Sequence, residues 1–173
     1  MQFQITETNY IVDDLEPDAE LVMQKHYQSL GYSVINNAAS ILVRPASTKK
    51  NEEWKTIERI VGSEKIAWAT EFSNRLLTGD GAHNTAPGHP DLLVYRDDGS
   101  EWFFVEVKQN SDYLKLGGMI GISMLHAMFG CRVEIARVNR SFKKKHVAPK
   151  TYRWVWPCIQ ELNSTRDYIN PNH

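Results

Sequence analysis

Apolar residues recur along the chain with two spacings, one typical of helices and the other of strands. Helical spacing predicts helices over four segments, residues 18–30, 52–61, 64–77 and 111–130. Short runs of β-branched and aromatic residues predict strands over residues 32–36, 39–45, 91–95, 101–108, 131–139 and 151–157. The first two runs could pair as a hairpin. This mixed order favours an α/β fold with a mixed β-sheet flanked by helices.

Glycine and polar residues punctuate these segments. The first predicted helix ends before Gly31, and Gly62-Ser63 separates the next two, with Ser63 as a candidate N-cap. Asp98-Gly99 lies between two apolar runs and is typical of a hairpin turn. We therefore expect an antiparallel pair of strands on either side of this turn.

Length and composition fit one compact domain over residues 1–173, since 42% of the residues are hydrophobic. The N-terminal segment has no basic start and no long apolar stretch, so we expect no membrane span and a cytoplasmic location. Cys131 and Cys158 have no metal-ligand spacing, which favours two reduced, packed thiols over a zinc site or a disulfide.

Charge is distributed unevenly, although the formal net charge is only −1. Residues 1–20 carry six acids and no Lys or Arg, whereas residues 132–153 carry eight bases and one acid. The basic hairpin region predicted at about residues 132–156 could attract phosphate groups, or it could simply be a solvated loop. Its candidate nucleic-acid-binding residues are Arg140, Lys143, Lys144, Lys145 and Lys150.

Charged residues also stand at the ends of the two strands around the predicted turn. Alternation places Glu106 and Lys108 on the same face of one strand, and the turn can bring Asp91 beside Glu106. Two close carboxylates repel unless a cation lies between them, and Mg²⁺ prefers oxygen ligands. A lysine there could orient a water molecule for hydrolysis of a phosphodiester. The alternative is a surface hairpin with a Glu106–Lys108 charge pair.

The segment "GHPDLLVY…EWFFVEVKQNSDYL" resembles the PD-(D/E)xK nuclease superfamily, and more narrowly the virus-type replication-repair nuclease (VRR-NUC) domain. The resemblance covers about residues 86–138. The catalytic positions match Asp91, Glu106 and Lys108. Gly88 matches the glycine before the motif, and Asp112 and Leu114 match the opening of the next helix.

The resemblance implies a restriction-endonuclease-like core and a nuclease that uses Mg²⁺ or Mn²⁺. Its metal ligands would be Asp91, Glu106 and the backbone carbonyl of Val107. Glu20 on the first helix matches a further acidic position, although it is also a favourable first-turn acid, and Glu71 on a later helix is a rival.

Two departures from the family pattern affect the expected site. A helical insertion at about residues 46–86 precedes the motif, and Gly117-Gly118 stand where relatives often carry glutamine. Their missing side chains would let a phosphate backbone or a partner helix approach, while Gln109 is a further candidate polar contact.

We therefore expect a metal-dependent nuclease that hydrolyses DNA and is structure-selective in replication, repair or recombination, whether as an endonuclease or an exonuclease. Two alternatives stay open: a catalytically inactive nucleic-acid-binding or assembly protein on the same fold, and a nuclease that acts on RNA or small nucleotides. A homodimer would supply two sites for two strands.

Overall fold

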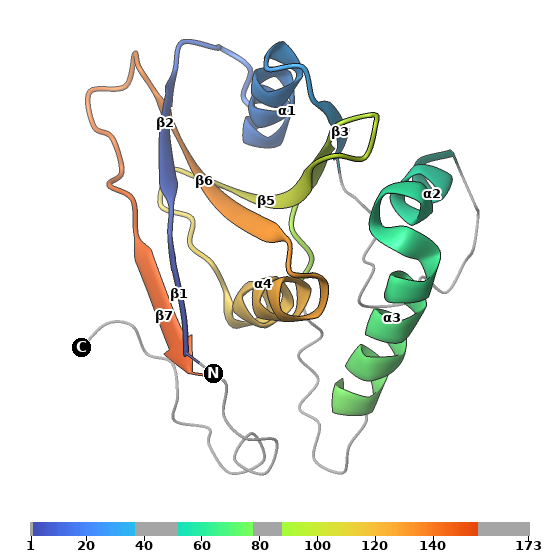
Figure 1. The fold of residues 1–173 in the computed structure, drawn as a ribbon. Helices are drawn as coiled ribbons and strands as arrows, with labels where there is room; N and C mark the ends of the chain where they lie inside the picture. Colours follow the sequence, from blue (N-terminus) through green and yellow to red (C-terminus); the bar gives the residue numbers. More distant parts are fainter. Residues whose placement is uncertain (1, 37–51, 78–87, 156–173) are drawn as a thin grey trace.

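The computed structural model describes residues 2–36, 52–77 and 88–155 (Figure 1). The strands are β1 (Gln2–Thr6), β2 (Thr8–Val12), β3 (Ser33–Asn36), β4 (Leu92–Tyr95), β5 (Trp102–Gln109), β6 (Arg132–Arg140) and β7 (Thr151–Val155). The helices are α1 (Ala19–Ser29), α2 (Glu52–Ile57), α3 (Ser63–Leu77) and α4 (Leu116–Phe129), and a π-helical turn, η1 (Glu58–Gly62), joins α2 to α3.

A five-stranded mixed sheet in the order β2-β6-β5-β4-β3 forms the centre of the molecule. β6 runs parallel to both β2 and β5, whereas β4 runs antiparallel to β5 and β3. β1 and β7 pair separately as an antiparallel ribbon. The predicted restriction-endonuclease-like α/β architecture, a mixed sheet flanked by helices, is therefore confirmed.

Helices cover both faces of the sheet. α1 packs through Met23 and Tyr27 against the face formed by Phe103, Val105 and Val107. The other face is covered by α4 and by the insertion, whose buried apolar residues are Ile57, Ile60, Val61, Ile66 and Ala69. In Figure 1 these helices lie on the side of the sheet opposite α1. The predicted alternation in β5 is correct, because Phe104 and Phe103 belong to the clusters on opposite faces.

The first helix forms where its sequence predicts. The Asp18 carboxylate accepts hydrogen bonds from the N–H groups of Glu20 (2.9 Å) and Leu21 (3.3 Å), which caps the first turn. Gly31 follows the helix with φ +79°, a left-handed conformation that glycine adopts without steric cost. These local signals hold Glu20 in the first turn of α1.

The ends of the other predicted helices differ from expectation. Ser63 has helical dihedrals, φ −60° and ψ −37°, so it is not an N-cap and the chain continues from η1 into α3. α4 begins at Leu116, because residues 110–115 form a turn in which Asn110 has φ 49°. The predicted helical insertion is confirmed over residues 52–77, and its remaining parts lie outside the described residues.

One predicted hairpin needs revision, and part of another lies outside the described residues. The basic region is not a hairpin, because β6 pairs with β5 and β2 while β7 pairs with β1. β1 and β2, the partners of β7 and of one edge of β6, are strands that we did not predict. β3 pairs with β4, and the strand expected at residues 39–45 lies outside the described residues. Within the part of the chain that the structure describes, no helix is long and apolar enough to span a membrane.

Candidate active site

The antiparallel pairing of β4 and β5 brings the predicted acidic residues together. Leu92 lies opposite Val105, so Asp91 at the entrance to β4 lies beside the following residue, Glu106. The Asp91 Oδ2 atom accepts a hydrogen bond from the Val107 N–H at 2.6 Å. This bond fixes the half-buried Asp91 carboxylate against β5, at the position that the motif predicts.

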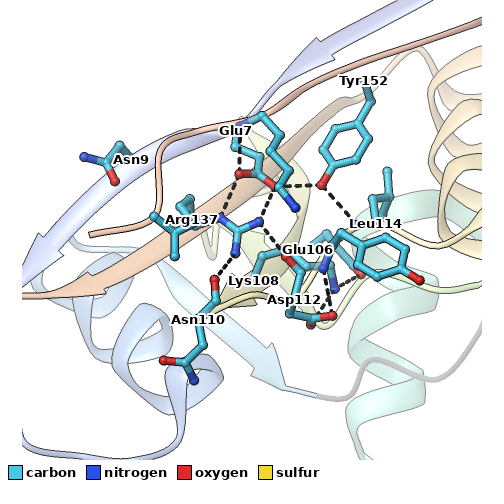
Figure 2. Close-up of polar contacts among 12 residues, drawn as sticks. Glu7, Asn9, Glu106, Lys108, Asn110, Asp112, Leu114, Arg137 and Tyr152 are labelled. Atoms are coloured by element: carbon cyan, nitrogen blue, oxygen red, sulfur yellow. Dashed lines mark hydrogen bonds and ion pairs between the residues drawn. The ribbon is translucent and has the colours of Figure 1, made fainter. Parts of the chain in front are cut away.

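Lys108 lies between two carboxylates of the same site (Figure 2). Its Nζ is 2.6 Å from Glu106 Oε1 and 3.6 Å from Asp112 Oδ2. The Lys108 and Glu106 side chains are only 10% and 11% exposed, whereas Asp112 is 47% exposed. The Lys108 ammonium therefore contacts the buried Glu106 carboxylate on one side and the more exposed Asp112 carboxylate on the other.

The environment shifts the pKa values of Glu106, Asp91 and Lys108. Burial raises the pKa of Glu106 to about 7, and the nearby Asp91 carboxylate adds to the shift. Burial also raises the pKa of Asp91, although the Val107 N–H opposes it. For Lys108 burial acts to lower the pKa, but Glu106, Asp112 and Asp91 together raise it. The site therefore holds more potential negative charge than one ammonium neutralises.

Glu20 faces the same site from α1. Its pKa is raised, first by burial and then by the negative charges of Asp91 and Asp18, while Lys108 opposes the shift. Glu20 is thus close enough to interact electrostatically with the predicted catalytic residues. Its rival Glu71 lies exposed on α3, in the insertion. The electrostatic interaction of Glu20 with Asp91 and Lys108 favours Glu20 over Glu71 as a further acidic residue near the site.

A pocket of about 240 Å³ opens over these charged groups. Its lining comes from the motif loop, β5, the segment between β5 and α4, and the start of α4. The lining residues are Gly88, His89, Glu106, Lys108, Asp112, Tyr113, Lys115 and Gly118. The Nδ1 atom of His89 lies 2.9 Å from the Pro90 carbonyl oxygen, and this contact helps to orient the ring. Burial lowers the pKa of His89 to about 4, so the ring is neutral near pH 7.

Glycines attach the motif loop to α4. The Gly88 N–H donates a 2.7 Å hydrogen bond to the Gly117 carbonyl oxygen. A Cβ on Gly121 would lie 1.7 Å from the Gly88 carbonyl oxygen, and one on Gly88 would lie 2.9 Å from the Gly118 nitrogen. The close approach expected at Gly117-Gly118 is therefore made by the chain's own Gly88 backbone. Gly118 still lines the pocket, and a Cβ added to it would lie 4.0 Å from Glu106 Oε1.

The predicted nucleic-acid-binding residues do not all have free side chains. Arg140 is only 8% exposed and donates hydrogen bonds to the carbonyl oxygens of Asp14 (3.2 Å) and Glu16 (2.5 Å), so it joins the segment before α1 to β6. Lys143 donates to Asn110 Oδ1 at 3.0 Å. These two contacts give Arg140 and Lys143 structural roles in the free protein.

The other predicted contacts lie around the site. Lys144, Lys145 and Lys150 are exposed. Gln109 and Lys145 line a second, small cavity of about 40 Å³ beside the end of β5.

A buried ion pair beneath the site escaped the sequence analysis. Arg137 is fully buried and Glu7 is 3% exposed, and the guanidinium donates to both Glu7 carboxylate oxygens at 2.7 and 2.5 Å. Burial acts to raise the pKa of Glu7, but hydrogen bonds from Arg137, the Lys150 N–H and Tyr152 lower it. The signal for this pair was an arginine between Ala136 and Val138 in a predicted strand.

Arg137 also reaches the turn that carries Asp112. Its Nη1 donates to the Asn110 carbonyl oxygen at 3.2 Å and its Nη2 to the Asp112 carbonyl oxygen at 2.8 Å. Tyr152 donates to Glu7 at 2.8 Å and accepts from the Leu114 N–H at 3.0 Å. Figure 2 shows this network running from Glu7 to the turn beside Lys108. The buried pair therefore holds one wall of the pocket.

No protein-family model and no curated protein matches the sequence. Solved structures similar to the chain include paFAN1 bound to DNA with a gap and a 5′ flap of two nucleotides, with 12% identity and a TM-score of 0.46. That match covers 81% of this chain and 38% of the other. A second paFAN1 structure, with a one-nucleotide flap, has 13% identity, a TM-score of 0.41 and coverages of 79% and 38%. The chain thus spans well under half the length of these proteins.

The residues of the sequence motif lie together at one place in the fold, on the paired strands β4 and β5 and the residue before β4. Glu106 and Lys108 on β5 line the pocket, the Val107 N–H holds Asp91 against the same strand, and the mixed sheet around them has helices on both faces. The chain therefore has a mixed α/β core, and the three residues predicted from the motif, Asp91, Glu106 and Lys108, lie together at the β4–β5 pair.

Proposed function

We propose that the protein is a metal-dependent nuclease that hydrolyses phosphodiester bonds in DNA. The observation that carries this proposal is the position of Lys108, 2.6 Å from Glu106 and on the wall of an open pocket. A binding module does not need a buried lysine between two acids. In a hydrolase such a lysine has a direct use, because an ammonium beside a water molecule can orient it and stabilise the hydroxide that forms.

The donor set fits Mg²⁺ or Mn²⁺. Asp91 and Glu106 would supply carboxylate oxygens, the Val107 carbonyl a third oxygen, and Glu20 a contact through water. Within the described residues no three His, Cys, Asp or Glu side chains converge as a ready-made metal site. This is compatible with Mg²⁺, which is commonly bound through one or two carboxylates together with waters and substrate phosphate oxygens. When bound, such an ion supplies Lewis acidity toward the phosphoryl group.

The chain's own residues would divide the remaining work. Glu106 positions the Lys108 ammonium, and Asp112 draws the same group toward the solvent side of the pocket. The Val107 N–H keeps the Asp91 carboxylate oriented. Exposed lysines on the β6–β7 connection, Lys144 and Lys145, would hold the nucleic-acid backbone by charge and would not read its sequence.

The test is cleavage of labelled single-stranded, duplex, flap and four-way-junction DNA, with RNA as a comparison, in Mg²⁺, Mn²⁺ and EDTA. Lys108→Ala removes the proposed ammonium, whereas Lys55→Ala removes an exposed lysine of α2 that pairs with Glu52 and serves as the matched control. We expect metal-dependent cutting by the wild type and Lys55→Ala but not by Lys108→Ala.

The same panel separates the alternatives. DNA binding without cutting in any metal would instead support an inactive binding protein. Cutting of RNA alone, or of nucleotides with little dependence on salt, would move the substrate away from DNA. If the protein cuts both strands of a duplex, we expect it to be a homodimer, and sedimentation measures its oligomeric state directly.

A further inference from the structure

Tyr113 is an exposed aromatic residue at the mouth of the pocket. It is 52% exposed, and it lines the same pocket as Glu106 and Lys108. Most of the described aromatic residues lie in the apolar clusters or pack against them, where they bury apolar area. Neither the proposed metal site nor the hydrolysis uses this ring. Its position therefore calls for a role in binding what enters the pocket.

The backbone on both sides of Tyr113 is tied to the buried network. The preceding carbonyl, that of Asp112, accepts a hydrogen bond from Arg137 at 2.8 Å. The following N–H, that of Leu114, donates to the Tyr152 hydroxyl at 3.0 Å. Figure 2 shows both ties meeting at the turn. An exposed ring on such a fixed turn binds a flat partner with little loss of conformational entropy.

Two lysines lie near the ring, on the same pocket that Glu106 and Asp112 also line. Lys150 Nζ lies 5.6 Å from the Tyr113 ring centroid, and Lys115 lines the pocket two residues further along the chain. An aromatic face beside lysines is the combination that binds single-stranded nucleic acids, because bases stack on the ring while phosphates contact the cations. A base inside a continuous duplex has both faces already stacked, so it could not use this ring without leaving the helix.

We infer that Tyr113 is a stacking platform for an unpaired nucleobase next to the phosphate held at Lys108, which makes single-stranded DNA or an unpaired end the preferred substrate. This inference rests on the proposed nuclease function and specifies its substrate class. Arg137 and Tyr152 act as positioning residues for the platform. Lys115 and Lys150 contact the flanking phosphates.

The first test compares Tyr113→Ala with Tyr113→Phe, which retains the ring. Fluorescence anisotropy in EDTA measures binding of a labelled single strand and of a matched duplex without any cleavage. We expect Tyr113→Ala to weaken single-strand binding by on the order of 10-fold, the effect of losing one stacked base, and to leave duplex binding unchanged. Tyr113→Phe should bind both as the wild type does. Circular dichroism verifies that the variants are folded.

The second test locates the base by placing an abasic site at successive positions of the single strand. At one position the abasic site should weaken wild-type binding by a similar factor and have no further effect on Tyr113→Ala. Equal losses in both proteins at every position would overturn the platform, as would equal weakening of duplex binding by Tyr113→Ala. Because both tests measure binding, an inactive wild type would contradict the nuclease proposal without deciding the platform.

Discussion

Arg137→Met should destabilise the fold strongly, because it removes a fully buried guanidinium and leaves its partners behind. Arg137 donates two hydrogen bonds to Glu7 and one each to the Asn110 and Asp112 carbonyls. Methionine is unbranched and apolar like the arginine stem, but it is shorter than arginine and has no hydrogen-bond donor. The Glu7 carboxylate, which is 3% exposed, would then be a buried charge without a counter-ion.

The expected magnitude follows from what Glu7 retains. Removing one partner of a buried ion pair typically costs about 3–5 kcal/mol. Glu7 would still accept hydrogen bonds from the Tyr152 hydroxyl at 2.8 Å and the Lys150 N–H at 3.0 Å. We therefore expect a loss toward the lower end, about 3 kcal/mol in the free energy of unfolding. This is a large part of the stability of an ordinary domain, roughly 5–15 kcal/mol.

Urea unfolding followed by tryptophan fluorescence and by circular dichroism measures this loss. The double variant Glu7→Leu with Arg137→Met removes both charges, so it should be more stable than the sum of the two single losses by at least about 1 kcal/mol. Lys55→Met is the surface control and should change stability by less than about 0.5 kcal/mol. A loss below about 1 kcal/mol for Arg137→Met, or additive losses in the double variant, would refute the reasoning.

Three further predictions concern pH, packing and capping. The folded pKa of Glu7 lies below its ordinary value of 4.5, so its contribution to stability is complete above pH 4.5 and is lost as the pH falls through the lowered pKa. Urea midpoints measured between pH 6 and 2 should therefore fall less steeply for Glu7→Gln than for the wild type. Equal slopes in the two proteins would contradict this. Gly121→Ala places a Cβ 1.7 Å from the Gly88 carbonyl oxygen, so thermal unfolding should show a loss of about 1–3 kcal/mol or more; an unchanged melting temperature would mean that the loop is not packed as described. Asp18→Ala removes the cap of α1 and should cost about 1 kcal/mol in urea unfolding, whereas Asp18→Ser should retain most of it, and equal losses would exclude capping.

Local signals allowed the motif and its strands to be predicted. Alternation in β5 and the turn at Gly99, which has φ +73°, determine which side chains share a face and which strands pair. The placement of Asp91 beside Glu106 follows from these features alone. The N-cap of α1 is similarly a matter of neighbouring residues, and it places Glu20 in the first turn.

Long-range pairing could not be predicted from the same signals. β2 and β6 are parallel neighbours whose paired residues are far apart in the sequence, and Glu7 lies 130 positions from Arg137. No strand was predicted in the acidic N-terminal segment, although Phe3 and Ile5 alternate with polar residues as in a strand. Gly117-Gly118 indicated a close approach, but only the fold shows that the Gly88 backbone makes it.

The most direct test of the central claim is the single-turnover cleavage rate of labelled single-stranded DNA in Mg²⁺, for the wild type and Lys108→Ala. The proposed role of the ammonium predicts a rate at least about 100-fold lower in the variant, with wild-type cutting abolished by EDTA. Equal rates in the two proteins, or wild-type cutting that persists in EDTA, would contradict the assignment of Asp91, Glu106 and Lys108 as a metal-dependent nuclease site.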